Sequence, residues 1–340
     1  MQIDGLWSGK LAGQEIVACF DDGRGAYYYR KHLKPIFLRE TVDEDRLKEG
    51  YGEDVPQWTF EKVEAEDLHA SWSDGERTYP IWLERRDWTA EQVDDWNMAC
   101  TSPEYFAPMG FEAEFDQGTY LNRDFPYRRL KWQPPEHFAG HDVTGFYFEP
   151  AEPGDMAILE ALAEQLDPAG EGSRFMSCLR QITASQSSEG IYDELTEPDF
   201  ANTNFLSARR SRSSYCGGAH PAYDMTFVLF DRQSGAAIDA RADWLSPKGF
   251  TKGDYGQLAI TDSLRSVVLS KYPEDFDEEC RYLLGEADSW EVGMVGTGLT
   301  FFPSLPYGAG PCMERRSVPW EELQLFLSPA GKLAAARTQG

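Results

Sequence analysis

The feature that most constrains the fold is a run of short strand-like segments over residues 1–87, which no helical pattern interrupts. Several segments alternate apolar and polar residues: in "LHASWSD", Leu68, Ala70 and Trp72 would share one face of a strand. Turn sequences such as "DDGRG" and "SDGE" separate the segments. This pattern predicts a small antiparallel β-barrel or sandwich, which we place at residues 1–90.

After a linker expected at residues 91–105, the pattern becomes mixed over residues 106–330. Strand-like and helix-like segments follow one another there, which predicts an α+β domain with helices packed on a sheet. Strands are expected at 110–116, 145–150, 173–186, 225–235, 289–295 and 298–304. Helices are expected at 154–170 with Asp155 as N-cap, at 256–273, at 277–286, and at 318–327 with Pro319 in the first turn. Residues 331–340 are expected to form a C-terminal tail.

The charge balance narrows the classes of partner. Asp and Glu number 58 against 32 Lys and Arg, so the formal net charge is −26. Phosphate backbones and anionic lipids would repel such a chain, so neither nucleic acid nor a membrane surface is expected as a partner. No apolar run is long enough for membrane insertion. A cationic protein would be attracted, and the alternative is that the acidity serves solubility alone.

Six cysteines are spread along the chain without a C-x-x-C pair, which argues against zinc and thioredoxin-type motifs. The spread suits disulfides in an oxidising compartment, and six buried thiols in a cytosolic protein are the alternative. The N-terminal "MQIDGLWSG" has neither the basic nor the apolar region of a signal peptide. We therefore expect either a cytosolic protein or an exported one whose signal peptide is absent from this sequence.

The stretch "SSYCGGAHPAYDMTFVLF" at residues 213–230 is the first candidate for chemistry. As a zinc site, Cys216 and His220 would need further ligands, which His137 and His141 in "HFAGH" could supply. Prolines and glycines around "HFAGH" disfavour a helix that would place both histidines on one face. No metal is therefore expected.

A catalytic pair of Cys216 and His220 is also disfavoured, because catalytic Cys and His usually come from separate segments rather than from one glycine turn. The sequence has no G-x-S-x-G, no P-loop, no H-E-x-x-H and no complete G-x-G-x-x-G. No catalytic residue and no cofactor are expected. The stretch is interpreted as a structural turn, in which Gly217 and Gly218 allow positive φ, His220 is a loop residue and Pro221 fixes the start of the next strand.

Three motifs occur in order in the second half of the chain: "YCGGAHP", "FVLFDRQSGAAIDARADWL" and "GLTFFPSLPYGAGPCMERRSVPWEELQLFL". The ordered set resembles a bacterial extracytoplasmic domain family of unknown function, which includes the lysozyme-receptor domain of the anti-sigma factor RsiV, and it covers residues 106–330. The N-terminal strands bear a looser resemblance to a small β-module that precedes this domain in exported proteins of Gram-negative bacteria. Domains of this family also occur attached to peptidoglycan deacetylases. The sequence lacks a sigma-factor-binding segment and a deacetylase metal motif, so no signalling or deacetylase role is carried over.

The resemblance implies a periplasmic or secreted protein that recognises or inhibits a cationic cell-wall hydrolase such as lysozyme, as an immunity protein against a delivered effector would. The alternative is an enzyme that acts on glycan or peptidoglycan through carboxylates that the sequence does not identify. For a chain that resembles exported proteins, we expect the disulfides Cys178–Cys216 and Cys280–Cys312.

The loop expected to bind the partner is 303–311, "PSLPYGAGP". Its prolines restrict the backbone, and Leu305, Pro306 and Tyr307 could serve as anchors for a cleft. The alternative is a plain connection between two strands, because loops carry binding residues often but not always.

Overall fold

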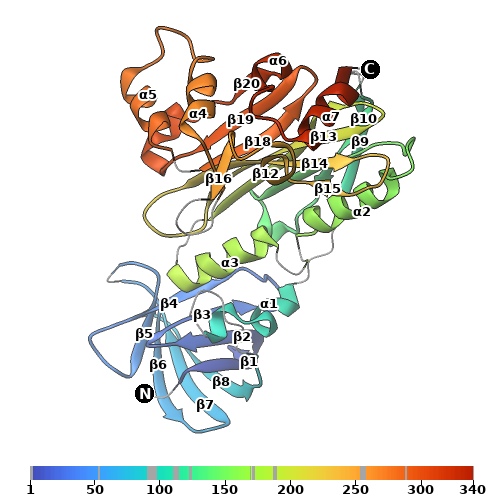
Figure 1. The fold of residues 1–340 in the computed structure, drawn as a ribbon. Coiled ribbons are helices and arrows are strands. Elements are labelled where there is room, and N and C mark those ends of the chain that lie inside the picture. The colour runs from blue at the N-terminus through green and yellow to red at the C-terminus, as the bar shows by residue number, and fades with distance from the viewer. Residues whose placement is uncertain are drawn as a thin grey trace.

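The computed structural model describes residues 3–52, 54–89, 98–109, 115–121, 125–168, 170, 173–186, 190–252, 258–287 and 289–339. An N-terminal β-barrel is followed by two stacked sheets with helices on their outer sides (Figure 1). This arrangement confirms the predicted class, a small antiparallel barrel and then a mixed α+β domain.

Eight antiparallel strands close the barrel in chain order. They are β1 (Gly5–Leu11), β2 (Gln14–Asp21), β3 (Arg24–Tyr29), β4 (Ile36–Glu40), β5 (Arg46–Glu49), β6 (Gln57–Val63), β7 (Asp67–Ser73) and β8 (Thr78–Arg86). Alternate side chains point inward, so the interior is filled with rings such as Trp7, Phe20 and Trp58. The outer face of β1–β3 is buried as well, because Val17 and Tyr28 pack against elements that follow the barrel.

A seven-stranded sheet forms the centre of the second part, in the order β15-β14-β13-β12-β11-β10-β9. The strands are β9 (Phe115–Leu121), β10 (Tyr127–Trp132), β11 (Asp142–Tyr147), β12 (Ile191–Ala201), β13 (Phe205–Tyr215), β14 (Ala222–Asp231) and β15 (Ala237–Ile238). The neighbours β11 and β12 are parallel, whereas the other pairs are antiparallel. Parallel neighbours need a crossover connection, and the helices α2 (Asp155–Leu166) and α3 (Arg174–Ser185) lie in that connection.

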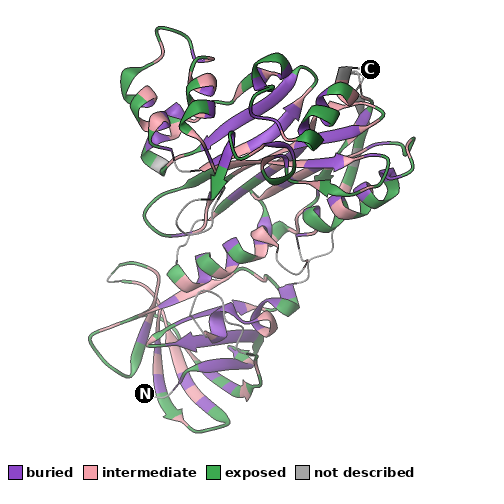
Figure 2. Ribbon diagram, in the orientation of Figure 1, coloured by how far each residue is buried: buried purple, intermediate pink, exposed green. Residues whose placement is uncertain are grey.

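A smaller sheet of β18 (Ser289–Val295), β19 (Gly298–Ser304) and β20 (Arg316–Pro319) packs over β12–β14. Close packing depends on Gly293 in β18, where a Cβ atom would lie 2.4 Å from the ring of Phe227 in β14. Around this core lie α4 (Asp262–Leu269), α5 (Glu278–Gly285), α6 (Trp320–Leu323), α7 (Pro329–Gln339) and the two-stranded sheet of β16 (Phe250–Lys252) and β17 (Leu258–Ile260). Every residue of β19 except Ser304 is buried, so the centre of the small sheet lies in the core (Figure 2).

Helices α2 and α3 cover the other face of the large sheet (Figure 1). Ile158 and Leu162 of α2 pack on β11, β13 and β14. Phe175 and Leu179 of α3 belong to a core that also contains residues of β1–β3. Helix α3 is therefore the element through which the barrel and the sheets share one apolar core.

Several expectations about single elements are wrong. Residues 173–186 form helix α3 and not a strand, because their buried side chains recur with helical spacing. The helix expected over 256–273 is shorter: β17 precedes Thr261, whose hydroxyl caps α4. Asp155 is the first residue of α2 rather than its N-cap, which is Gly154.

The chain around the expected linker and tail is also ordered. Helix η1 (Ala99–Thr101) and helix α1 (Pro103–Phe106) fall at residues 91–105, next to residues 90–97, which lie outside the described part. Most of 331–340 belongs to α7, which buries Ala334 and Ala335. Pro319 ends β20 and precedes the short helix α6.

Candidate partner-binding surface

The glycine turn connects β13 to β14. Gly217 and Gly218 have φ values of 86° and 95°, the region that glycine adopts without strain, as the sequence predicts. The hydroxyl of Tyr215 donates to the carbonyl oxygen of Gly218 at 3.0 Å and holds the turn. Pro221 comes directly before β14, and His220 is exposed.

Two disulfides fix two segments of the second part of the protein, the glycine turn after β13 and the loop after β19. Cys216 beside the turn is bonded to Cys178, and Cys312 is bonded to Cys280 of α5. Both pairs were expected, although Cys178 lies in a helix rather than in the strand that the sequence suggested. A disulfide restricts the unfolded chain and fixes the ends of a loop, so both segments are held in place covalently.

The loop after β19 is short and turns back quickly. Residues Tyr307–Cys312 form the 3₁₀ helix η5, and the N–H of Ala309 donates to the carbonyl oxygen of Pro306 at 2.8 Å. Leu305 is half-buried against the core under β18–β20. Pro306 is exposed, and the side chain of Tyr307 lies outside the described part of the chain.

The structure brings these two segments together in one hollow. It measures about 360 Å³ and is lined by Pro221, Ala222, Tyr223, Leu305, Gly310 and Met313. Tyr223 is 43% exposed and packs edge-on against the buried ring of Phe302, with 6.2 Å between the ring centroids. The glycine turn and the loop are far apart in the sequence, and no motif distinguishes Tyr223 or Met313, so the sequence alone does not predict this hollow.

The described lining of the hollow is largely apolar. Among its described lining residues there is no carboxylate, histidine or cysteine. Cys216 is oxidised in a disulfide, so it is neither a zinc ligand nor a nucleophile. Burial lowers the pKa of His137 and of His141, which lie in η3 (Glu136–Phe138) and just after it. Within the described residues, no three His, Cys, Asp or Glu side chains form a group that could hold a metal.

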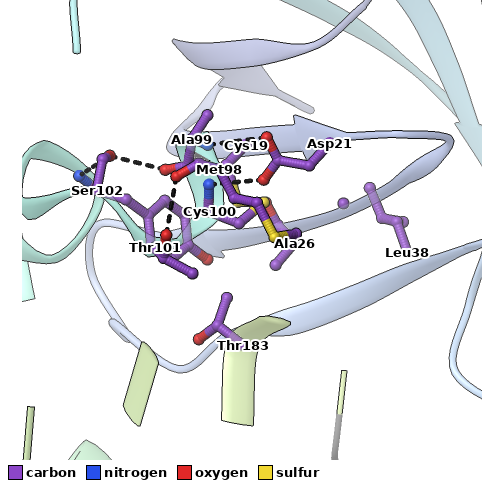
Figure 3. Close-up of a disulfide and its surroundings, with 12 residues drawn as sticks. Cys19, Asp21, Ala26, Leu38, Met98, Ala99, Cys100, Thr101, Ser102 and Thr183 are labelled. Atoms are coloured by element: carbon purple, nitrogen blue, oxygen red, sulfur yellow. Dashed lines mark hydrogen bonds between the residues drawn. A yellow bond between two sulfur atoms is a disulfide. The ribbon is translucent and has the colours of Figure 1, made fainter. Parts of the chain in front are cut away.

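A third disulfide, Cys19–Cys100, joins barrel strand β2 to η1 (Figure 3). Beside it, the carboxylate of Asp21 accepts hydrogen bonds from the backbone N–H groups of Ala99 and Cys100, both at 2.8 Å. Burial outweighs these hydrogen bonds and raises the pKa of Asp21 to about 6. This cluster explains why η1 packs on the barrel rather than forming an extended connection.

No helix in the described part of the chain has the length and apolar character of a membrane span. No protein-family model matches the sequence, and no curated protein matches it. Among solved structures, the chain is similar to a DUF3298 family protein from Pseudomonas aeruginosa, with 15% identity and a TM-score of 0.40 over 61% of this chain and 96% of the other. It is also similar to a member of the same family from Bacteroides fragilis, with 15% identity and a TM-score of 0.40 over 66% of this chain and 98% of the other.

Proposed function

We propose that the protein is an extracytoplasmic binding module that recognises a cationic cell-wall hydrolase such as lysozyme. The observation that carries the proposal is the exposed apolar hollow between Pro221–Tyr223 and Leu305–Met313, in a chain with a net charge of −26. Three disulfides and no free cysteine support a periplasmic or secreted location, because such bonds persist in oxidising compartments.

In this proposal, the negative net charge affects the rate of association and the hollow affects the rate of dissociation. A large negative charge raises the rate at which a cationic protein arrives, and it does so less at high salt. An aromatic anchor in a preformed surface slows dissociation, because its apolar area is removed from water without loss of much flexibility. Tyr223 is such an anchor, since it is held against Phe302 and still exposes part of its ring.

We propose binding rather than catalysis, with inhibition of the hydrolase as the purpose, as in an immunity protein. Three carboxylates with shifted pKa values, Asp155, Glu291 and Asp21, are each engaged by neighbouring groups of the fold. Arg232 binds Asp155 through two hydrogen bonds, at 2.8 and 2.6 Å, and Glu291, whose pKa is raised by burial, pairs with Arg241 at 3.1 Å. Asp21 is engaged by backbone groups.

The first test is surface plasmon resonance of the immobilised protein against a cationic lysozyme and a panel of periplasm-targeting effectors. We expect Tyr223→Ala and Leu305→Ala to speed dissociation, with a cost of about 2 kcal/mol if the residue is a hot spot. Tyr307→Ala tests the anchor that the sequence suggested. The control is Met156→Ala, because Met156 is also an exposed apolar residue but lies on α2, on the opposite face of the large sheet.

Raised salt should slow association and leave dissociation nearly unchanged, because screening acts mainly on the approach of the partners. No binding to any hydrolase at low salt would overturn the proposed function. Binding that responds equally to Met156→Ala and Tyr223→Ala would overturn the assignment of the hollow. Hydrolysis of peptidoglycan by the purified protein would favour the enzyme instead.

A further inference from the structure

A second surface lies on the outside of the barrel, where β1, β8 and β7 run side by side. Its centre is Trp82 of β8, which is 61% exposed. The other described tryptophans are buried or half-buried. The buried ones are Trp7, Trp58, Trp132, Trp244, Trp290 and Trp320. Trp82 does not stand alone, because its ring lies beside that of His69 in an open hollow bordered by polar side chains, and an exposed apolar patch with a polar rim marks a ligand-binding surface.

The indole is held by its neighbours. His69 of β7 lies directly across from Trp82 in the ladder, and the two rings are 4.8 Å apart between centroids with planes tilted by 32°. On the other side, Lys10 of β1 is the ladder partner of Trp82. Since all three strands belong to a closed barrel, the platform is rigid before any ligand arrives.

Polar side chains surround the platform. Asp67 and Glu84 lie opposite each other on β7 and β8, and Arg86 donates from Nε to the hydroxyl of Ser8 at 2.5 Å. Together with Trp82, His69 and Lys10, these residues line an open hollow of about 500 Å³. The rim thus offers two carboxylates and two cationic groups, so it carries little net charge although the whole chain is strongly acidic.

This combination fits a sugar ring better than a protein. A pyranose has a face of C–H groups that can stack on an indole, and its edge carries hydroxyls that both donate and accept hydrogen bonds. The centres of protein interfaces are depleted of Lys, Glu and Asp, whereas here such residues border the aromatic ring on both sides. The size of the hollow is within the range of small-molecule sites.

We propose that the outer face of β1, β8 and β7 is a binding site for an uncharged saccharide. One pyranose ring stacks on Trp82, and its hydroxyls bind Asp67 and Glu84 as acceptors and Lys10 and Arg86 as donors. The site belongs to the barrel and shares no lining residue with the hollow at Tyr223, so it adds glycan attachment to the proposed recognition of a protein.

The test is isothermal titration calorimetry of the full chain with three neutral trisaccharides: triacetylchitotriose, cellotriose and maltotriose. We expect saturable binding of at least one at concentrations up to about 10 mM, and a loss of affinity of about tenfold or more in Trp82→Ala. Trp82→Phe should retain part of the affinity, because a smaller ring remains. Asp67→Asn and Glu84→Gln should weaken binding without changing the circular dichroism.

Tyr223→Ala is the matched control, because it removes the anchor of the other surface and should leave trisaccharide binding unchanged. This variant also separates the two proposals, since lysozyme binding should respond to Tyr223 and trisaccharide binding to Trp82. Absence of saturable binding for all three sugars would overturn the saccharide site. So would equal affinity in Trp82→Ala, or a protein partner that binds through Trp82 while no sugar does.

Discussion

At the scale of single residues, Asp21 shows two opposing effects on one carboxyl group. Its oxygens accept two backbone hydrogen bonds from η1, which favour the ionised form. Burial favours the neutral form more strongly, so the pKa rises from 3.8 to about 6. The folded protein therefore binds this proton more tightly than the unfolded chain, and ionisation of Asp21 weakens the folded state.

This shift sets the direction of a pH dependence. As pH rises from about 4 to about 6, ionisation of Asp21 should lower the free energy of unfolding. The total decrease should be roughly 3 kcal/mol, because each unit of the pKa shift corresponds to 1.36 kcal/mol. In Asp21→Asn, which cannot ionise, the free energy of unfolding should lack this fall. The measurement is urea unfolding of both proteins at a series of pH values. A constant difference in unfolding free energy between them from pH 4 to pH 7 would contradict the assignment.

At the scale of elements, the end of α3 connects the two parts of the protein. Gln186 follows the helix with φ of 53°, and its side-chain amide donates to the carbonyl oxygens of Gly25 at 3.2 Å and Leu38 at 2.8 Å in the barrel. Arg39 of β4 donates back to the carbonyl oxygen of Gln186 at 2.6 Å. One buried residue thus ends the helix and bonds it to two barrel strands.

Two substitutions separate these roles of Gln186. Gln186→Gly keeps the left-handed backbone available and removes both side-chain hydrogen bonds, which should lower the unfolding free energy by roughly 1–3 kcal/mol. Gln186→Ala should cost about 1 kcal/mol more, because alanine is strained at positive φ. Urea unfolding followed by far-UV circular dichroism measures both. Equal stability of the alanine and glycine variants would show that the backbone conformation is unimportant there.

Local sequence patterns indicate some elements of this fold more clearly than others. Barrel strands were predictable because alternation and glycine turns are local signals, as at Leu68 and Ala70. Helix α3 contradicts the predicted strand: Phe175, Leu179 and Ile182 recur at helical intervals, and this period, rather than the apolar content of the segment, indicates its structure. The hollow at Tyr223 could not be predicted, since it requires β14 and the loop after β19 to meet through sheet packing that no local pattern specifies.

At the scale of the whole molecule, the excess of acidic residues acts on the protein itself. The sequence has 58 Asp and Glu against 32 Lys and Arg, so its formal net charge is −26. Such an excess destabilises a compact state through repulsion. Exposed ion pairs such as Lys62–Glu64, with 2.7 Å between Nζ and Oε1, contribute only about 0–1 kcal/mol each and do not offset a general repulsion.

Salt should therefore affect the free protein and the proposed complex in opposite directions. At neutral pH, raising sodium chloride from about 10 mM to about 150 mM shortens the Debye length from about 30 to about 8 Å, which relieves repulsion and should raise Tm. The same change should slow association with a cationic hydrolase, because it screens attraction equally. Differential scanning calorimetry measures the first effect.

Repeating it near pH 4.5, the isoelectric point of the sequence, provides the control, since the rise in Tm should largely disappear when the net charge is near zero. A Tm that falls with salt at neutral pH would mean that ion pairs outweigh repulsion. The carboxylates would then be paired within the protein and could not steer a cationic partner.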